Sequence, residues 1–145
     1  MTTPWTLTFD AAEPARLAAF WKVALGYVDA PPPQGFDSWE DWFVRLGVPE
    51  EERDDGAGIA DPDGVAPGIS FLKVPEGKVA KNRVHLDVQV GGGRGQPWEV
   101  RWTRVTEAVE RLTAAGATAI EQSDNDGTPD HVVMADPEGN EFCVV

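Results

Sequence analysis

The chain contains one five-residue turn twice, and this repeat restricts the possible folds more than any other feature of the sequence. Residues 60–64 read ADPDG and residues 135–139 read ADPEG. Each copy lies between two apolar segments, and an Asp-Pro-acid-Gly sequence in that position is typical of a turn that joins two strands. A repeated turn with matching surroundings predicts two copies of one structural unit.

The two halves of the chain also begin in the same way. The segment 6–9 precedes a helical pattern that ends at Gly26, and the segment 85–88 precedes one that ends at Gly116. A glycine directly after the last periodic residue is the usual end of a helix. Each half therefore reads as a strand, a helix and then three strands.

Hydrophobic periodicity gives the boundaries of the expected elements. Helices are predicted at 14–25, 38–46 and 103–115, and strands at 5–9, 27–28, 58–60, 69–74, 83–90, 117–122, 131–135 and 141–145. The second helix has Ser38 as a capping residue and an aromatic stripe with helical spacing.

These elements predict an α+β protein of two βαβββ modules, which pair their sheets into one curved cup with the helices on its outer face. Module one covers about 1–76 and includes an acidic insertion at about 30–58. Module two covers about 82–145. A chain of 145 residues has the usual size of a single domain, so we expect 1–145 to form one.

The charge restricts the partners. The formal net charge is −13, and residues 37–63 contain ten acidic residues against two arginines. This balance argues against nucleic acid and anionic membranes as partners.

No segment resembles a signal peptide or a membrane span, which predicts a cytoplasmic protein. Cys143 is the only cysteine, so a metal site would depend on histidine and carboxylate ligands as well.

Four segments in this order resemble the vicinal oxygen chelate superfamily, in its glyoxalase-like branch. They read AAFWKVALGY at 18–27, KNRVHLDV at 81–88, LTAAGA at 112–117 and DPEGNEFCV at 136–144. The resemblance implies the two-module cup. It does not specify the reaction, because the superfamily includes glyoxalases, ring-cleaving dioxygenases, epimerases, fosfomycin-modifying thiol transferases and metal-free proteins that sequester bleomycin-type antibiotics.

Enzymes of this superfamily hold a divalent metal with two side chains from each module. With a three-residue insertion after Gly64, the repeat places Thr6 opposite His85 and Phe71 opposite Cys143. Of these four residues, His85 is the usual type of ligand, and Cys143 is a candidate as a thiolate. Thr6 and Phe71 are poor ligands and are assigned to ligand binding instead.

The candidate catalytic residues are His85, Asp87 and Glu141. His85 and Asp87 lie two residues apart on one strand face, and Glu141 shares the face of Cys143. His85 is interpreted either as a proton shuttle or as a metal ligand, and a cup-facing histidine that hydrogen-bonds ligand or water is the simpler alternative. His131, after Asp130, is expected to form a local hydrogen bond.

The tryptophans leave two interpretations open. The stripe that contains Trp39 and Trp42 either packs on the sheet or closes over the cup as a lid that stacks a ring-bearing ligand. Trp98 and Trp102 are candidates for a homodimer contact.

Two functions compete on these grounds, with a purely structural or partner-binding module as a third. The first is a small-molecule-binding, lyase-like enzyme with a degenerate metal site, which abstracts a proton next to a carbonyl. The second is a non-catalytic protein that sequesters a cationic aromatic compound, as bleomycin-resistance proteins do.

Overall fold

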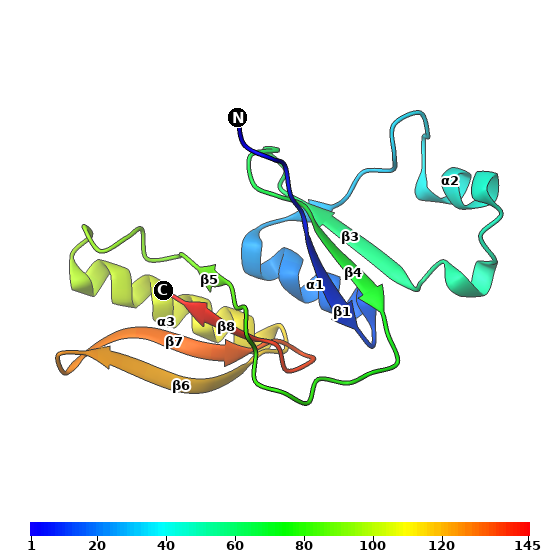
Figure 1. Ribbon diagram of the computed structural model, residues 1–145. Coiled ribbons are helices and arrows are strands. Elements are labelled where there is room, and N and C mark those ends of the chain that lie inside the picture. Colours follow the sequence, from blue (N-terminus) through cyan, green and yellow to red (C-terminus); the bar gives the residue numbers. More distant parts are fainter. The chain divides into compact units, whose positions relative to one another are not determined.

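The computed structural model describes residues 1–145, and it divides them into two compact units, Met1–Gly77 and Lys78–Val145. We call these units module one and module two. Each contains a four-stranded sheet with a helix against it (Figure 1). The α+β class and the two-module organisation are therefore confirmed.

Module one begins with a strand and a helix and then forms three more strands. Its elements are β1 (Leu7–Ala11), α1 (Pro14–Leu25), β2 (Val28–Asp29), α2 (Trp39–Leu46), a 3-10 turn (Glu50–Glu52), β3 (Gly56–Ala60) and β4 (Ile69–Lys73). The sheet order is β1-β4-β3-β2, with β1 parallel to β4 and the other pairs antiparallel.

Module two repeats this plan without the insertion. Its elements are β5 (Asp87–Val88), α3 (Trp98–Ala114), β6 (Thr118–Asn125), β7 (Thr128–Ala135) and β8 (Glu141–Val144). The order β5-β8-β7-β6 matches that of module one, and β5 is again parallel to β8. The repeat read from the sequence is thus a repeat of topology.

The repeated turn has the same internal hydrogen bonding in both modules. The carboxylate of Asp61 accepts from the backbone N–H of Asp63 at 3.0 Å, and that of Asp136 accepts from the N–H of Glu138 at 2.9 Å. An aspartate that bonds the backbone two residues ahead closes a turn locally. Hydrogen bonds from the backbone N–H groups of Ala66 and Asp63 lower the pKa of Asp61 below its ordinary value.

Each module has its own core between sheet and helix. In module one the ring of Phe9 lies 5.3 Å from Trp21 of α1 and 5.5 Å from Phe71, and Trp21 and Phe71 are each 1% exposed. In module two the fully buried side chains come from α3, β7 and β8: Val105, Leu112, Met134, Phe142 and Val144. None of the helices has both the length and the apolar character needed to span a bilayer.

Several predicted boundaries differ from the structure by one to three residues, and those of one strand and one helix differ more. The strand predicted at 83–90 has only two ladder residues, Asp87 and Val88, and Val84 is 73% exposed. The reason is that the parallel partner β8 begins at Glu141, directly after the turn at 136–140, so the residues before His85 have no strand beside them. The last helix begins at Trp98 rather than Thr103, with Pro97 as its N-cap residue.

Candidate functional site

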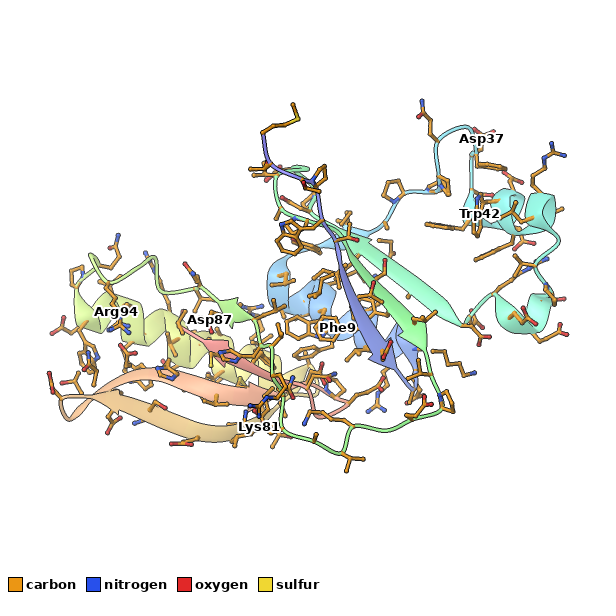
Figure 2. The ribbon with its side chains drawn as sticks, in the orientation of Figure 1. Phe9, Asp37, Trp42, Lys81, Asp87 and Arg94 are labelled. Atoms are coloured by element: carbon orange, nitrogen blue, oxygen red, sulfur yellow. The ribbon has the colours of Figure 1, made fainter.

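Module one contains a pocket of about 730 Å³ between its sheet and the α2 segment. This volume lies within the range of about 300 to 1,000 Å³ that is common for small-molecule sites. The rings of Trp39, Trp42 and Phe43 form one wall, and Figure 2 shows Trp42 at α2 in module one.

The sequence builds this wall through one capped helix. The hydroxyl of Ser38 accepts a hydrogen bond from the N–H of Asp41 at 3.0 Å, so α2 begins where the sequence predicts. No residue of α2 is buried, although one face of the helix is aromatic. The stripe therefore does not belong to the core, and the aromatic side chains remain available to a ligand.

The three rings contact one another. Trp39 and Trp42 meet edge to face with centroids 5.6 Å apart, and Trp42 and Phe43 lie 5.5 Å apart at 64°. The indole N–H of Trp39 donates to the carbonyl oxygen of Ala30 at 2.9 Å, which links α2 to the segment after β2. This bond anchors the wall to module one, while its rings stay partly exposed.

The floor of the pocket is made mostly of residues with small side chains, with Leu72 as a larger one. Strand alternation directs Ile59, Ile69 and Phe71 toward α1 and leaves the opposite face to the pocket. The residues that border the pocket from the sheet and its loops include Gly56, Gly58, Ala60, Gly68, Ser70, Thr6 and Thr8. Such a floor leaves the backbone accessible to a flat molecule.

The charges around the pocket are mostly paired. Arg53 donates to Glu40 at 2.5 Å, and its guanidinium carbon lies 6.0 Å from the ring centre of Phe43. Asp29 accepts from Lys22 at 2.7 Å. Glu52 also lines the pocket and is in none of the ion pairs, so the unbalanced charge at the pocket is negative.

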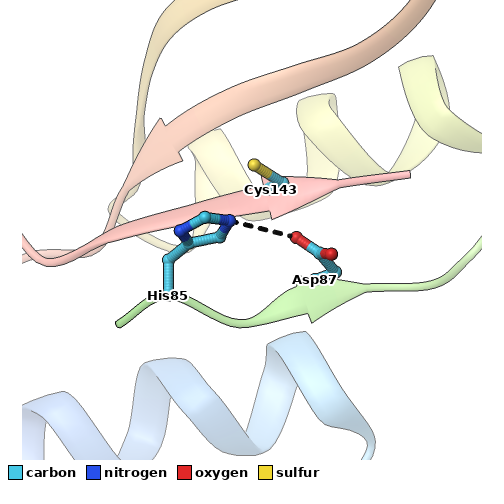
Figure 3. A group of neighbouring side chains, drawn as sticks. All are labelled: His85, Asp87 and Cys143. Atoms are coloured by element: carbon cyan, nitrogen blue, oxygen red, sulfur yellow. Dashed lines mark ion pairs between the residues drawn. The ribbon is translucent and has the colours of Figure 1, made fainter. Parts of the chain in front are cut away.

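Module two contains a group of three possible ligand residues, His85, Asp87 and Cys143 (Figure 3). One ligand atom from each lies within 4.8 Å of the others. The Nε2 atom of His85 is 3.5 Å from a carboxylate oxygen of Asp87. Asp87 and Cys143 are direct partners in the β5–β8 ladder, and the Cys143 N–H donates to the carbonyl oxygen of Leu86 at 2.9 Å.

The environment of Cys143 keeps its thiol protonated. Burial raises the pKa of this thiol above its ordinary value, and the neighbouring Asp87 carboxylate raises it further. The Lys81 ammonium lowers this pKa, but by less than burial raises it. Unassisted, Cys143 is therefore a weak nucleophile.

Glu141 is not part of the His85–Asp87–Cys143 group. Its carboxylate is paired with the ammonium of Lys81, and this hydrogen bond is the main reason why the pKa of Glu141 lies below its ordinary value. The sequence placed Glu141 near Cys143 because of strand alternation, but the ion pair to Lys81 is a long-range contact that alternation does not reveal.

The ladders correct one of the predicted correspondences between the modules. Thr8 pairs with Ser70 in module one, as Asp87 pairs with Cys143 in module two. The counterpart of Cys143 is therefore Ser70, and the insertion after Gly64 is one residue shorter than predicted. Phe71 borders the pocket but has its ring in the core. The predicted match of Thr6 with His85 agrees with this register.

The alignment of the two ladders also shows which module has side chains suited to bind a metal ion. Module one offers only the hydroxyls of Thr6 and Ser70 at the two matching positions, and neutral hydroxyls are weak ligands. Module two offers an imidazole, a carboxylate and a thiol within 4.8 Å, a donor set suited to a divalent transition metal. The residues of module two therefore fit such an ion.

A second polar cluster surrounds Asp130, and the sequence analysis predicted only its local hydrogen bond to His131. Asp130 is 5% exposed and accepts two hydrogen bonds from Arg94, at 2.7 and 2.8 Å, and one from Arg101 at 3.1 Å. His131 lies 3.0 Å from the same carboxylate. The Arg94 hydrogen bonds and the His131 contact hold the pKa of Asp130 well below its usual range. This cluster ties the glycine-rich loop 91–95 to α3 and β7.

Comparisons with known proteins agree with this architecture. A family model described as a glyoxalase-like domain matches residues 6–145. No curated protein matches the chain.

Solved structures show the same fold at low identity. A glyoxalase/bleomycin resistance protein/dioxygenase family enzyme from Burkholderia phytofirmans PsJN is 16% identical, with 96% of this chain and 94% of that chain covered and a TM-score of 0.60. A variant of the fosfomycin resistance protein FosX from Listeria monocytogenes, complexed with Mn(II) and 1S,2S-dihydroxypropylphosphonic acid, is 12% identical, with 99% and 89% covered and a TM-score of 0.62. TioX from Micromonospora sp. ML1 is 13% identical, with 99% and 97% covered and a TM-score of 0.53.

Proposed function

Since the chain belongs to the glyoxalase-like family of the vicinal oxygen chelate superfamily, we propose that it is a small-molecule-binding protein whose ligand occupies the pocket of module one. The ligand class is a planar, ring-containing cation. The observation that carries the proposal is the aromatic wall of α2 over a floor of small residues.

The geometry of the pocket favours a flat ligand. Trp39, Trp42 and Phe43 present half-exposed rings, and each ring stacked on a ligand contributes about 0.5 to 1.5 kcal/mol beyond the apolar area it buries. Gly58 and Ser70 lie side by side in the floor and offer a ring a surface of small residues, and Leu72 adds one larger apolar contact.

The charge of the pocket favours a cation. Glu52 is unbalanced there, and residues 37–63 contain ten acidic residues against two arginines. A cation over an indole ring also gains about 0.5 to 2 kcal/mol. Anionic ring compounds are expected to bind more weakly for the same reasons.

Quenching of tryptophan fluorescence tests this function. The probes are proflavine, a planar cation, and 9-anthracenecarboxylate, a planar anion of similar size. We expect saturable binding of proflavine, weaker binding of the anion, and a loss of affinity of roughly tenfold or more in Trp42→Ala, since a stacking anchor is removed. Trp98→Ala, which removes an indole from module two, is the matched control and should bind as the native protein does. Equal affinity in native protein and Trp42→Ala would contradict the proposal.

A second candidate function rests on the pair formed by His85 and Asp87. The carboxylate beside Nε2 favours the imidazole tautomer with its proton on that nitrogen, which leaves Nδ1 free to accept a proton. Asp87 then stabilises the imidazolium that forms. Both side chains are about half-exposed, so a substrate has access. This arrangement supports a lyase-like enzyme that removes a proton next to a carbonyl.

A divalent metal held by His85 and Cys143 would supply a Lewis acid that polarises the carbonyl. The FosX structure contains Mn(II), which supports metal-assisted chemistry as one option for this fold. In that case His85 would be a ligand rather than the base.

Proton transfer is measurable without knowledge of the natural substrate. Hydroxyacetone in D₂O, followed by proton NMR, reports exchange at the carbon beside the carbonyl. Exchange above the buffer rate that is lost in His85→Ala, but kept in His131→Ala, supports the catalytic function. Exchange that is unchanged in His85→Ala excludes His85 as the base.

The superfamily resemblance also favours a homodimer. Trp98 and Trp102 stack with centroids 6.5 Å apart at 10°, and Trp98 is 37% exposed. Sedimentation velocity of native protein and Trp102→Ala tests whether these rings form a contact between copies.

A further inference from the structure

We propose that His85, Asp87 and Cys143 form a metal site contained entirely within module two, with selectivity for a thiophilic divalent ion such as Zn²⁺. The superfamily pattern takes two ligands from each module. In this chain the carboxylate comes from Asp87, two residues after His85, and module one contributes no ligand. The inference does not depend on the pocket of module one.

The distances suit a tetrahedral ion. Two ligand atoms that are each about 2.0 to 2.3 Å from a tetrahedral zinc lie about 3.3 to 3.8 Å from one another. His85 Nε2 and an oxygen of Asp87 are already 3.5 Å apart, and all three ligand atoms lie within 4.8 Å. The longest of the three separations therefore exceeds the tetrahedral range by about 1 Å at most.

The backbone holds the three residues in place. Asp87 and Cys143 are paired in the parallel ladder, and His85 lies two residues before Asp87, in the segment that leads into β5. Backbone bonds on both sides fix this arrangement: the Cys143 N–H donates to Leu86 at 2.9 Å, and the Val145 N–H donates to Val88 at 3.0 Å. Asp87 and Cys143 come from paired strands and His85 from the segment directly before β5, and three protein ligands leave a fourth position open for water or a small molecule.

The donor set determines the type of ion. A thiolate with an imidazole favours Zn²⁺, Co²⁺ or Cd²⁺, whereas Mn²⁺ and Mg²⁺ prefer sites made of oxygen. The nearest additional carboxylate, Glu141, is paired with Lys81 and therefore does not supply the oxygen ligands that Mn²⁺ prefers. Two anionic ligands with a neutral imidazole also balance the charge of a divalent ion.

Cobalt titration of the tag-free, full chain tests the site by spectroscopy and requires no activity. We expect one Co²⁺ per chain, a near-ultraviolet thiolate-to-cobalt charge-transfer band, and the strong visible bands of tetrahedral cobalt. Zn²⁺ should bleach these bands, and excess Mn²⁺ should not.

Variants assign the ligands. Cys143→Ser should lose the charge-transfer band. His85→Ala and Asp87→Asn should each weaken cobalt binding by at least about tenfold, because even an outer-shell partner is worth roughly 10- to 100-fold in affinity. His131→Ala is the matched control and should bind cobalt normally. Far-ultraviolet circular dichroism checks that each variant is folded.

Three results would overturn the inference: no charge-transfer band in the folded native protein, a band that persists in Cys143→Ser, or equal affinity for Mn²⁺ and Co²⁺. None of these results would affect proflavine binding in module one. Failure of this inference is therefore distinguishable from failure of the proposed function.

Discussion

Asp130 shows how strongly one buried side chain can depend on its partners. Its carboxylate joins Arg94, Arg101 and His131, which come from the glycine-rich loop, α3 and β7. Because the folded pKa lies below the unfolded value, the stabilisation is complete above about pH 4 and is lost as the pH falls toward the folded pKa.

We therefore expect Asp130→Asn to lose about 2 kcal/mol of stability at pH 7, since charged hydrogen bonds are removed and Arg101 is left without its counterion. The difference between variant and native protein should shrink as the pH is lowered below 4. Urea unfolding at pH 7 and pH 3 measures both effects. Asp124→Asn, an exposed aspartate on β6, is the control and should change little at either pH.

The close packing around Gly91 leads to a second prediction, which concerns the addition of a single Cβ atom. A Cβ at this position would lie 2.5 Å from Cγ of Arg101, and at Gly95 it would meet nothing within 4 Å. Gly91→Ala should therefore displace Arg101 and destabilise the protein by about 1 to 3 kcal/mol, the usual cost of overpacking. Gly95→Ala should be nearly neutral. Thermal unfolding of the two variants compares them, and equal midpoints would show that the loop adjusts freely.

At the scale of elements, α2 is held by its cap and by few other contacts. No residue of this helix is buried, so the Ser38 cap is a large part of what holds its first turn. Ser38→Ala should destabilise the helix by about 1 kcal/mol. Because α2 carries the aromatic wall, the same change should weaken proflavine binding.

Hydrogen exchange measures this local effect. Amides in 39–46 should exchange faster in Ser38→Ala, while those of β1 and β4 should not change. Ser38→Thr keeps a hydroxyl and should restore both protection and affinity. Faster exchange throughout module one would instead indicate that α2 supports the whole fold.

The sequence predicts these elements as far as local patterns reach. The Ser38 cap, the glycine that ends α1 and the two repeated turns are set by neighbouring residues, and all three were identified correctly. The strand at 83–90 was too long because its length depends on where β8 begins, and an alternating pattern does not contain that information.

The candidate site could likewise be predicted only where the repeat or a local pattern identifies its residues. The repeat located His85 and Cys143 because the two halves align, but the count failed by one residue at the insertion after Gly64, so Phe71 replaced Ser70. Arg94 and Asp130 are 36 residues apart, and no local pattern links them. An ion pair between residues so far apart in the sequence depends on how the loop, α3 and β7 pack together.

At the scale of the whole molecule, the two modules share one topology but have different chemistry on the same sheet face. The row Thr8, Ser70 and Gly58 in module one corresponds to Asp87, Cys143 and Val133 in module two. The row in module one consists of small, uncharged side chains, and the row in module two contains two of the candidate metal ligands, Asp87 and Cys143. Binding of an aromatic ligand and binding of a metal are thus assigned to separate modules.

This separation predicts independent effects of the two ligands. Zn²⁺ should slow amide exchange in β8 and leave β4 unchanged, whereas proflavine should protect β3 and β4 and leave β8 unchanged. Hydrogen exchange with each ligand alone measures this, with Cys143→Ser as the control for zinc and Trp42→Ala as the control for proflavine. Protection of β4 by zinc in the native protein would show that the modules are coupled.

The parallel pairing of β1 with β4 has a consequence for the order in which the chain folds. Leu7 meets Ile69, so the first strand has no partner until more than sixty further residues exist. The β3–β4 hairpin and α1 need only nearby residues, and contacts between distant residues form more slowly because long loops must close. During synthesis we expect the β3–β4 hairpin to form first and β1 to pair with β4 afterwards. Module one should then be folded before module two has been synthesised.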